Sequence, residues 1–363
     1  MQRTVLAAGL AAGLLASTAA LAQPNVVASI LPLQSLAAMV MDGVGEPEVL
    51  LPAGASPHAY SFRPSDAAKL EGADVVLWIG ADMERFLERP LATLASGARI
   101  VAMADAPGVT LLPVRAGGAW DDHDHDHGHD DHGHAHDDDH AHDDHAHDDH
   151  GHAHDDDHAH DDHDHAHDDD HAHDDHDHAD ADHAHDHHDG AVDTHIWLAP
   201  DNAKAMVRAI AVTLGEVDAP NADAYTANAE AAVTALAELE DDLRERLAPV
   251  RGEPFVVFHD AYQYFEQAFG LNAVGSVTVS PEVQPGTAQL AELRERVEDA
   301  GATCVFAEPQ FEPRLVVMLT EGTAARRGVL DPLGADLEPG PDAYPQLLRN
   351  LADAMVACLA EPS

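Results

Sequence analysis

Positively charged residues are scarce in this sequence: Lys and Arg together number 18, against 67 Asp and Glu. Proteins that bind nucleic acid through its phosphates carry clusters of such cations. No basic patch is present here, so nucleic acid is excluded as a partner. Long apolar runs are missing too. Beyond the N-terminus no stretch approaches the roughly 20 apolar residues that cross a bilayer, and we expect no direct membrane anchor.

The N-terminus has the pattern of a secretory signal peptide, which we assign to residues 1–22. Arg3 provides a positive start, residues 5–15 form an apolar run, and Ala20-Leu21-Ala22 is a small-x-small cleavage site. We expect cleavage before Gln23. The apolar run is too short for a spanning helix, and no cysteine near the cleavage site could carry a lipid. The sequence therefore predicts a soluble protein exported to the periplasm.

Only two cysteines are present, Cys304 and Cys358. In an oxidising compartment an even number of cysteines indicates disulfide pairing. The alternative is a pair of thiolate metal ligands, but the spacing does not fit a compact zinc motif and the compartment is wrong for it. We therefore expect a Cys304–Cys358 disulfide.

Histidine is rare outside one segment, residues 119–190, which we call the His/Asp tract. It holds all but three of the 30 histidines, together with 29 aspartates and no Lys or Arg. Neutral imidazole suits zinc, copper and nickel, so the tract indicates metal binding. Between residues 121 and 189 no apolar residue is larger than alanine, so we expect disorder without metal. The first candidate accessory ligands are His123, His125, His127, His129, His132, His134 and His136.

Short apolar runs alternate with helical patterns on both sides of the tract. Alternation of this kind favours parallel sheets covered by helices. We expect strands at 25–30, 48–51, 74–79, 99–102, 254–258, 273–279, 303–306 and 329–330. Helices are expected at 32–41, 201–214, 221–248, 262–269 and 287–299, from Pro313 onward, and at the C-terminus, where the last helix carries Cys358.

These elements predict an α/β fold of two parallel-sheet lobes joined by a long helix. Leu236, Leu239, Leu243 and Leu247 give the long helix one apolar stripe. We place an N-terminal lobe at 23–218 with the tract inserted in it, a linking helix at 219–250, and a C-terminal lobe at 251–363.

The three histidines outside the tract are His58, His195 and His259, and each lies beside a predicted strand or at a strand-like edge. Open parallel sheets bind ligands at the carboxyl ends of their strands. Two histidines from the first lobe and one from the second would therefore meet in a cleft between the lobes. Three unrelated histidines with local hydrogen bonds are the alternative, which the shared placement and the neighbouring tract disfavour.

A fourth ligand could come from Asp331, which also ends a short predicted strand in the second lobe, or from water. Three imidazoles with a carboxylate or water form a tetrahedral site suited to zinc, whereas manganese would use more oxygen ligands. Asp260 adjoins His259, and we expect it either to support that histidine from outside the ligand set or to cap the following helix.

Several motifs together resemble those of the high-affinity zinc-binding periplasmic proteins of bacterial ABC importers. The likeness covers essentially the whole mature chain outside the tract. The motifs are Gly54-Ala-Ser-Pro-His58-Ala-Tyr60, Arg63-Pro-Ser-Asp66, His195-Ile-Trp-Leu198, Phe258-His259-Asp260-Ala-Tyr262, Pro281-Glu-Val-Gln-Pro-Gly286, Phe306-Ala-Glu-Pro-Gln-Phe311 and Leu330-Asp331-Pro-Leu-Gly334.

The resemblance implies two α/β lobes joined by a rigid helix, with the metal in the cleft and with His58, His195 and His259 as ligands. A His/Asp-rich loop before the second ligand is typical of the zinc members, and the cysteine pair matches a disulfide of some members. Certain members carry an acidic residue just before the first histidine, where this chain has Pro57. Asp331 or water must then fill the fourth position.

The function expected from these features is capture of Zn²⁺ in the periplasm and delivery to the membrane permease of an ABC zinc importer, by a monomer that is not an enzyme. The tract would serve as a weaker, faster-exchanging collector. A periplasmic zinc buffer or adhesin without a transport role is the alternative. A zinc hydrolase also uses three histidines and a water, but no HExxH motif is present and no carboxylate stands out as a general base.

Overall fold

The computed structural model describes residues 23–115, 191–278, 286–299, 301–311 and 314–360. The predicted signal peptide, the His/Asp tract with its accessory histidines, and most of the motif at 281–286 lie outside the described residues. All the described residues belong to one compact unit. None of the helices in these ranges is both long enough and apolar enough to cross a membrane.

The first parallel sheet has the strand order β2-β1-β3-β4. Its strands are β1 (Val26–Ala28), β2 (Glu48–Val49), β3 (Val75–Trp78) and β4 (Arg99–Ala102). The central strands β1 and β3 are apolar throughout and almost wholly buried, as is usual for strands covered on both faces. Around them lie α1 (Leu31–Val40), α2 (Pro64–Glu71), α3 (Arg85–Leu94) and α4 (Pro200–Val217).

The second parallel sheet has the order β6-β5-β7-β8. Its strands are β5 (Pro254–His259), β6 (Asn272–Thr278), β7 (Cys304–Ala307) and β8 (Arg326–Val329), and its helices are α6 (Gln263–Phe269), α7 (Thr287–Asp299), α8 (Arg314–Thr320) and α9 (Ala343–Leu359). Two parallel α/β sheets confirm the predicted fold class.

The predicted strand at 329–330 is wrong in position. The chain pairs with β7 earlier, from Arg326 opposite Cys304 to Val329 opposite Ala307. Two arginines and a glycine hid this strand, because β8 is an edge strand whose residues alternate between half-buried and exposed. Gly328 is needed there, since a Cβ atom would come within 2.5 Å of the Phe306 ring.

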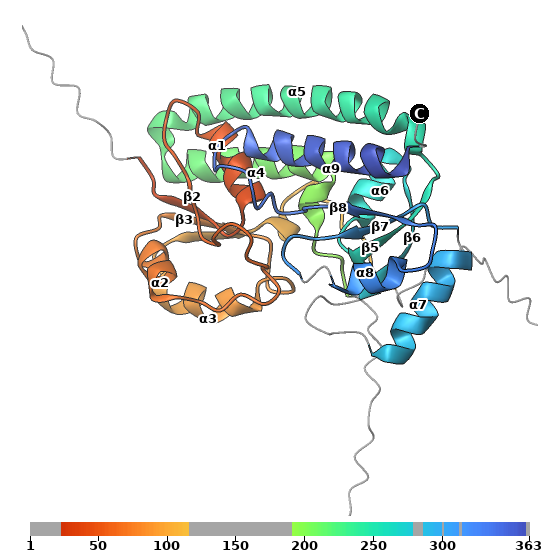
Figure 1. Ribbon diagram of the computed structural model, residues 1–363. Coiled ribbons are helices and arrows are strands. Elements are labelled where there is room, and N and C mark those ends of the chain that lie inside the picture. Colours follow the sequence, from red (N-terminus) through yellow and green to blue (C-terminus); the bar gives the residue numbers. More distant parts are fainter. Residues whose placement is uncertain (1–22, 116–190, 279–285, 300, 312–313, 361–363) are drawn as a thin grey trace, which may run out of the picture. The chain divides into compact units, whose positions relative to one another are not determined.

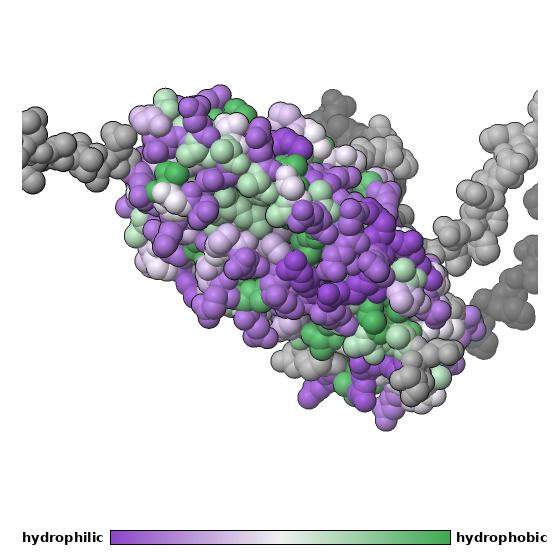
Figure 2. Space-filling model, turned by 90° about the horizontal axis from the view of Figure 1, so that it is seen from above, coloured by the Kyte–Doolittle hydropathy of each residue, from purple (hydrophilic) through white to green (hydrophobic). Residues whose placement is uncertain are grey.

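The long helix α5 (Ala222–Leu247) follows the first sheet in sequence and precedes the second. It packs against α1 and α4 and also against α6 and α9, and Figure 1 shows it running beside α4 and α9. Its predicted leucine stripe is buried in an apolar core that includes residues from both sheets. Figure 2, which views the molecule from above, shows mainly hydrophilic residues over this face.

The predicted disulfide is confirmed. Cys304 in β7 is bonded to Cys358 in α9, so the bond ties the second sheet to the C-terminal helix. Both cysteines are buried.

Glu84 is a fully buried carboxyl that lies between β3 and α3. Its Oε2 accepts hydrogen bonds from the backbone N–H groups of Ile79 at 2.7 Å and Gly80 at 3.4 Å. Burial nevertheless raises the pKa of Glu84 to about 7, because desolvation disfavours the carboxylate more than these hydrogen bonds favour it.

We expect the Glu84→Gln substitution to change how stability depends on pH. Because the pKa is raised in the folded state, protonation of Glu84 stabilises the folded protein. This contribution is complete at pH values below the ordinary carboxyl pKa and is lost as the pH rises through about 7. Between acidic and mildly alkaline pH, the free energy of unfolding of the variant should therefore rise relative to that of the parent by on the order of 3 kcal/mol. Urea unfolding across this range measures the difference; a gap between the two proteins that is independent of pH would refute the assignment.

Candidate metal centre

His58 lies in the loop between β2 and α2 and is the most exposed of the three candidate histidines, being half-buried. Its backbone N–H donates to the Ser56 hydroxyl at 3.3 Å. The loop turns through Gly54, whose positive φ of 76° suits glycine. This turn carries the chain from the end of the sheet to the imidazole.

His195 is buried at the start of a short 3₁₀ helix, η2 (Ile196–Leu198). The carboxylate of Asp193 holds it twice: Oδ1 lies 2.7 Å from the His195 Nδ1 and accepts the His195 backbone N–H at 3.0 Å. With Nδ1 bonded to an acceptor, the tautomer with a free lone pair on Nε2 is favoured.

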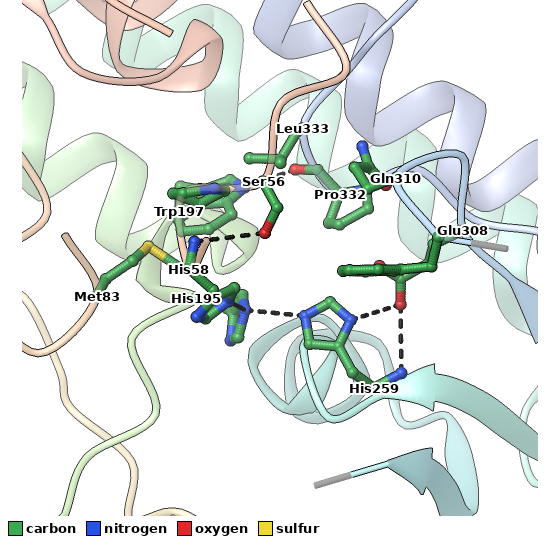
Figure 3. A pocket seen from close by; sticks show the side chains of 12 residues that line it. Ser56, His58, Met83, His195, Trp197, His259, Glu308, Gln310, Pro332 and Leu333 are labelled. Carbon is green, nitrogen blue, oxygen red and sulfur yellow. Dashed lines mark hydrogen bonds and ion pairs between the residues drawn. The ribbon is translucent and has the colours of Figure 1, made fainter. Parts of the chain in front are cut away.

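His259 ends the central strand β5 and has a matching partner in Glu308, which follows β7. The Glu308 Oε1 lies 2.6 Å from the His259 Nδ1 and accepts the His259 backbone N–H at 3.3 Å. Both residues are buried. Figure 3 shows the two contacts and the His259 ring directed toward His195. The free lone pair of His259 is thus also placed on Nε2.

The Nε2 atoms of the three histidines converge on one point. The Nε2 of His195 lies 3.2 Å from that of His58 and 3.2 Å from that of His259. The three candidate ligand nitrogens all fall within 4.8 Å of one another, and among the described residues this is the group that could hold a metal ion. At 3.2 Å the nitrogens of each pair are also within hydrogen-bond distance, with the donor and acceptor set by which ring nitrogen carries a proton.

Electrostatics keep the cluster ready for a cation. Burial, together with the neighbouring imidazoles of His195 and His259, lowers the pKa of His58 to about 2. Burial and the nearby His259 also lower the pKa of His195 well below its usual value. For His259, burial opposes the charged form, but the Glu308 carboxylate outweighs it and raises the pKa. Neutral imidazole, the form that binds metal, is therefore favoured at two of the three positions.

A cavity of about 10 Å³ lies at this point, comparable with the space that one water-sized probe occupies. The cavity is lined by residues that lie next to the first sheet and by residues that lie next to the second, and Figure 3 shows these side chains. Trp197 and Pro332 close one side, where the Trp197 indole N–H donates to the Pro332 carbonyl at 2.8 Å. The remaining lining residues are Ser56, Pro57, Met83, Glu308, Gln310, Phe311 and Leu333.

Asp331 is not among the residues of the cluster. Its carboxylate accepts backbone N–H groups from Leu333 at 3.0 Å, Gly334 at 3.0 Å and Ala335 at 2.6 Å. It also accepts the amide N–H of Gln310 at 2.9 Å. These bonds shape the turn after β8 and orient Gln310, which lines the cavity.

Asp260 does not cap α6, because the N-cap of that helix is Tyr262 and no side chain caps it. Its carboxylate instead pairs with Arg115.

Sequence reasoning assigned no role to Asp193 or Glu308. Asp193 lies two residues before His195, a spacing that lets one carboxylate reach both the backbone N–H and the ring. Glu308 follows the buried strand β7, at the same end of the sheet as His259. A carboxylate at that edge beside a predicted histidine ligand was a usable signal.

We expect Glu308→Gln to weaken zinc binding by roughly 10- to 100-fold, because a neutral amide is a poorer acceptor for the ligand's Nδ1–H than a carboxylate. Competition against a chelator measures the change. The matched control is Glu216→Gln, which removes an exposed carboxylate 3.8 Å from Arg99. Equal affinities for parent and Glu308→Gln would show that Glu308 does not tune the ligand.

Three imidazole nitrogens facing one small cavity, between two parallel α/β sheets, define a metal-binding protein of the two-lobe solute-binding class. The particular family follows from comparison with known proteins. Residues 26–358 match the family of ZnuA, the periplasmic component A of the zinc-uptake complex, and the chain belongs to this family.

Its relatives span nearly the full length. The high-affinity zinc uptake system protein ZnuA of Brucella suis is 48% identical over 356 residues, covering 98% of this chain and 98% of the relative. The protein of the same name from Yersinia pestis is 38% identical over 365 residues, covering 99% and 98%.

Solved structures share the fold. A crystal structure of ZnuA matches with a TM-score of 0.67 at 22% identity, covering 93% of this chain and 100% of that one. The Pseudomonas aeruginosa protein FpvC in complex with Mn²⁺ matches with a TM-score of 0.66 at 19% identity, covering 93% and 98%.

Proposed function

We propose that this protein binds one Zn²⁺ ion in the periplasm through the Nε2 atoms of His58, His195 and His259 and delivers it to the permease of an ABC zinc importer. The observation that carries the proposal is the buried convergence of three imidazole nitrogens, two of them backed by carboxylates. Three nitrogen ligands favour zinc over manganese, which prefers oxygen. Membership of the zinc-uptake family supports the same metal.

We infer that the fourth ligand is a water molecule and not Asp331. The Asp331 carboxylate already accepts three backbone N–H groups and the Gln310 amide. The Gln310 side chain donates its N–H to Asp331, which directs its amide oxygen away from that carboxylate. The amide oxygen is buried and accepts no hydrogen bond from any described residue. Gln310 lines the cavity, so its oxygen could accept a hydrogen bond from a metal-bound water.

The mature chain starts at Gln23, acts as a monomer, and meets the permease with the ion held in the cleft. Its N-terminal lobe comprises residues 23–218, its linking helix residues 219–250 and its C-terminal lobe residues 251–363. The His/Asp tract collects ions at many weaker sites.

Transport is tested in cells that lack this protein. Under zinc chelation, the parent gene should restore growth and zinc accumulation, whereas a gene with His58, His195 and His259 all changed to alanine should restore neither. Normal growth of the deletion strain under chelation would instead favour a zinc buffer or adhesin.

A zinc hydrolase is disfavoured by the carboxylates beside the cluster. Asp193 and Glu308 are both engaged with the Nδ1 atoms of histidines, so neither is placed as a general base for a metal-bound water. Assays with ester and peptide substrates test this, and sustained zinc-dependent turnover would overturn the binding role.

A further inference from the structure

The described segments that precede and follow the His/Asp tract in sequence, residues 112–115 and 191–193, lie side by side. The segments 112–115 and 191–193 run antiparallel, with Pro113 opposite Val192. The Val114 N–H donates to the Ala191 carbonyl at 3.0 Å, and the Asp193 N–H donates to the Leu112 carbonyl at 2.8 Å. We call this pair of segments the stem. It ends two residues before His195.

The stem is continuous with a segment fixed to the first lobe through Asn202 of α4. This side chain is buried, accepts the backbone N–H of Thr110 at 2.8 Å and donates to the Thr110 carbonyl at 3.0 Å. It also donates to the Ile196 carbonyl at 3.1 Å. One amide therefore holds the chain on both sides of the stem.

The stem is attached to the second lobe through Tyr264 of α6. The buried Tyr264 hydroxyl donates to the Asp193 carbonyl at 2.7 Å and accepts the Leu112 N–H at 2.9 Å. It thus contacts both segments of the stem.

Arg115 makes the second attachment, and it is the stronger one. Its guanidinium donates to both oxygens of Asp260, with Nε at 3.0 Å from Oδ2, and to both oxygens of Glu266 in α6, at 2.8 and 3.0 Å. Two-pronged bonds of this kind need the planar fork of arginine. We call these contacts of Arg115 with Asp260 and Glu266 the clamp. Asp260 directly follows His259 in sequence, so the clamp holds the chain next to a candidate ligand.

The Arg115 cluster is largely withdrawn from water. The side chain of Arg115 is 18% exposed, that of Asp260 11%, and that of Glu266 8%. Removing the cation would leave two neighbouring carboxylates buried without their counter-charge, which is strongly unfavourable. The two segments of chain that Arg115 joins would be expected to move apart.

We propose that Arg115 is a positioning residue of the metal centre: by clamping the stem to Asp260 and Glu266, it holds His195 and His259 together and slows release of the bound ion. The proposal rests on the zinc site described above. Arg115 contacts Asp260 and Glu266 and not the candidate ligand nitrogens, so its loss would loosen the ligands around a bound ion without changing the ligands that the ion meets. The clamp should therefore affect the rate at which the ion leaves.

The test measures zinc association and dissociation in the full-length chain, loaded with less than one equivalent of zinc so that the tightest site fills first. Arg115→Met is expected to raise the dissociation rate by at least roughly tenfold and to change the association rate by less than about threefold. Arg115→Lys should recover part of the loss, because an ammonium keeps the charge but not the fork.

The matched control is Arg246→Met, which removes an arginine that pairs with Asp242 and Asp353 on the outer surface. It should leave both rates unchanged. Should Arg115→Met fail to fold, Tyr264→Phe removes only the hydroxyl that joins the two stem segments to α6, and it should raise the dissociation rate in the same direction.

Each outcome is decisive. One outcome is a parent with a tight site that is lost in His259→Ala, while the folded Arg115 and Tyr264 variants release zinc at the parental rate. That combination would overturn the role proposed for Arg115 and leave the zinc function intact. A parent protein without such a site would overturn both.

Discussion

Zinc affinity is expected to fall by at least about a hundredfold when His259 is replaced by alanine. Four-ligand structural zinc sites bind with roughly 10–16 kcal/mol, so one ligand accounts for several kcal/mol, and each 1.4 kcal/mol is a factor of ten. The loss should be severe because His259 is buried and its lone pair is aimed at the cluster by Glu308. Competition with a high-affinity chelator at substoichiometric zinc measures it.

The His/Asp tract supplies the matched control for this substitution. His152→Ala also removes one imidazole, but from a segment with many others, and tight binding should be unchanged. If the two variants weaken binding equally, the cluster has no special role.

Removal of the disulfide is expected to destabilise the protein by about 4 kcal/mol, the chain-entropy value for a bond closing a loop of this length. The bond joins Cys304 to Cys358 across 54 positions of sequence. In the Cys304→Ala/Cys358→Ala double variant, this corresponds to a fall in Tm of roughly 10 °C. Thermal and urea unfolding of the zinc-free proteins measure the change.

The zinc affinity of the same double variant is the internal control. The disulfide links β7 to α9 and neither cysteine lines the cavity, so affinity should stay close to that of the parent. Unfolding at the parental midpoint would show that the bond contributes little to stability.

Much of the fold could be predicted because its central strands are short, apolar and buried. The runs at β1, β3, β5 and β7 are uninterrupted by polar residues until their ends, and the structure places strands at each. The strand β8 was misplaced because Arg326, Arg327 and Gly328 leave it no apolar run, whereas the edge strand β4 still contains Ile100-Val-Ala102.

The candidate site could be predicted in part for a different reason. With almost every histidine gathered in one tract, the three outside it were conspicuous, and the structure brings His58, His195 and His259 together. Residues that act through hydrogen bonds carried a weaker signal: the place of Glu308 after a predicted strand made it a candidate but did not name its partner, and Arg115 had no signal at all. Glu308 lies 49 positions from His259, and Arg115 lies 145 positions from Asp260. Only the folded chain brings such partners into contact.

The central claim is that the defined site is the three-histidine cluster and not the His/Asp tract, although the tract holds nearly all the histidines. It is tested most directly by a zinc titration of the protein lacking residues 120–190. One tight equivalent is expected to remain and to vanish when His58, His195 or His259 is changed to alanine in the shortened chain. Loss of tight binding with the tract alone would contradict the claim.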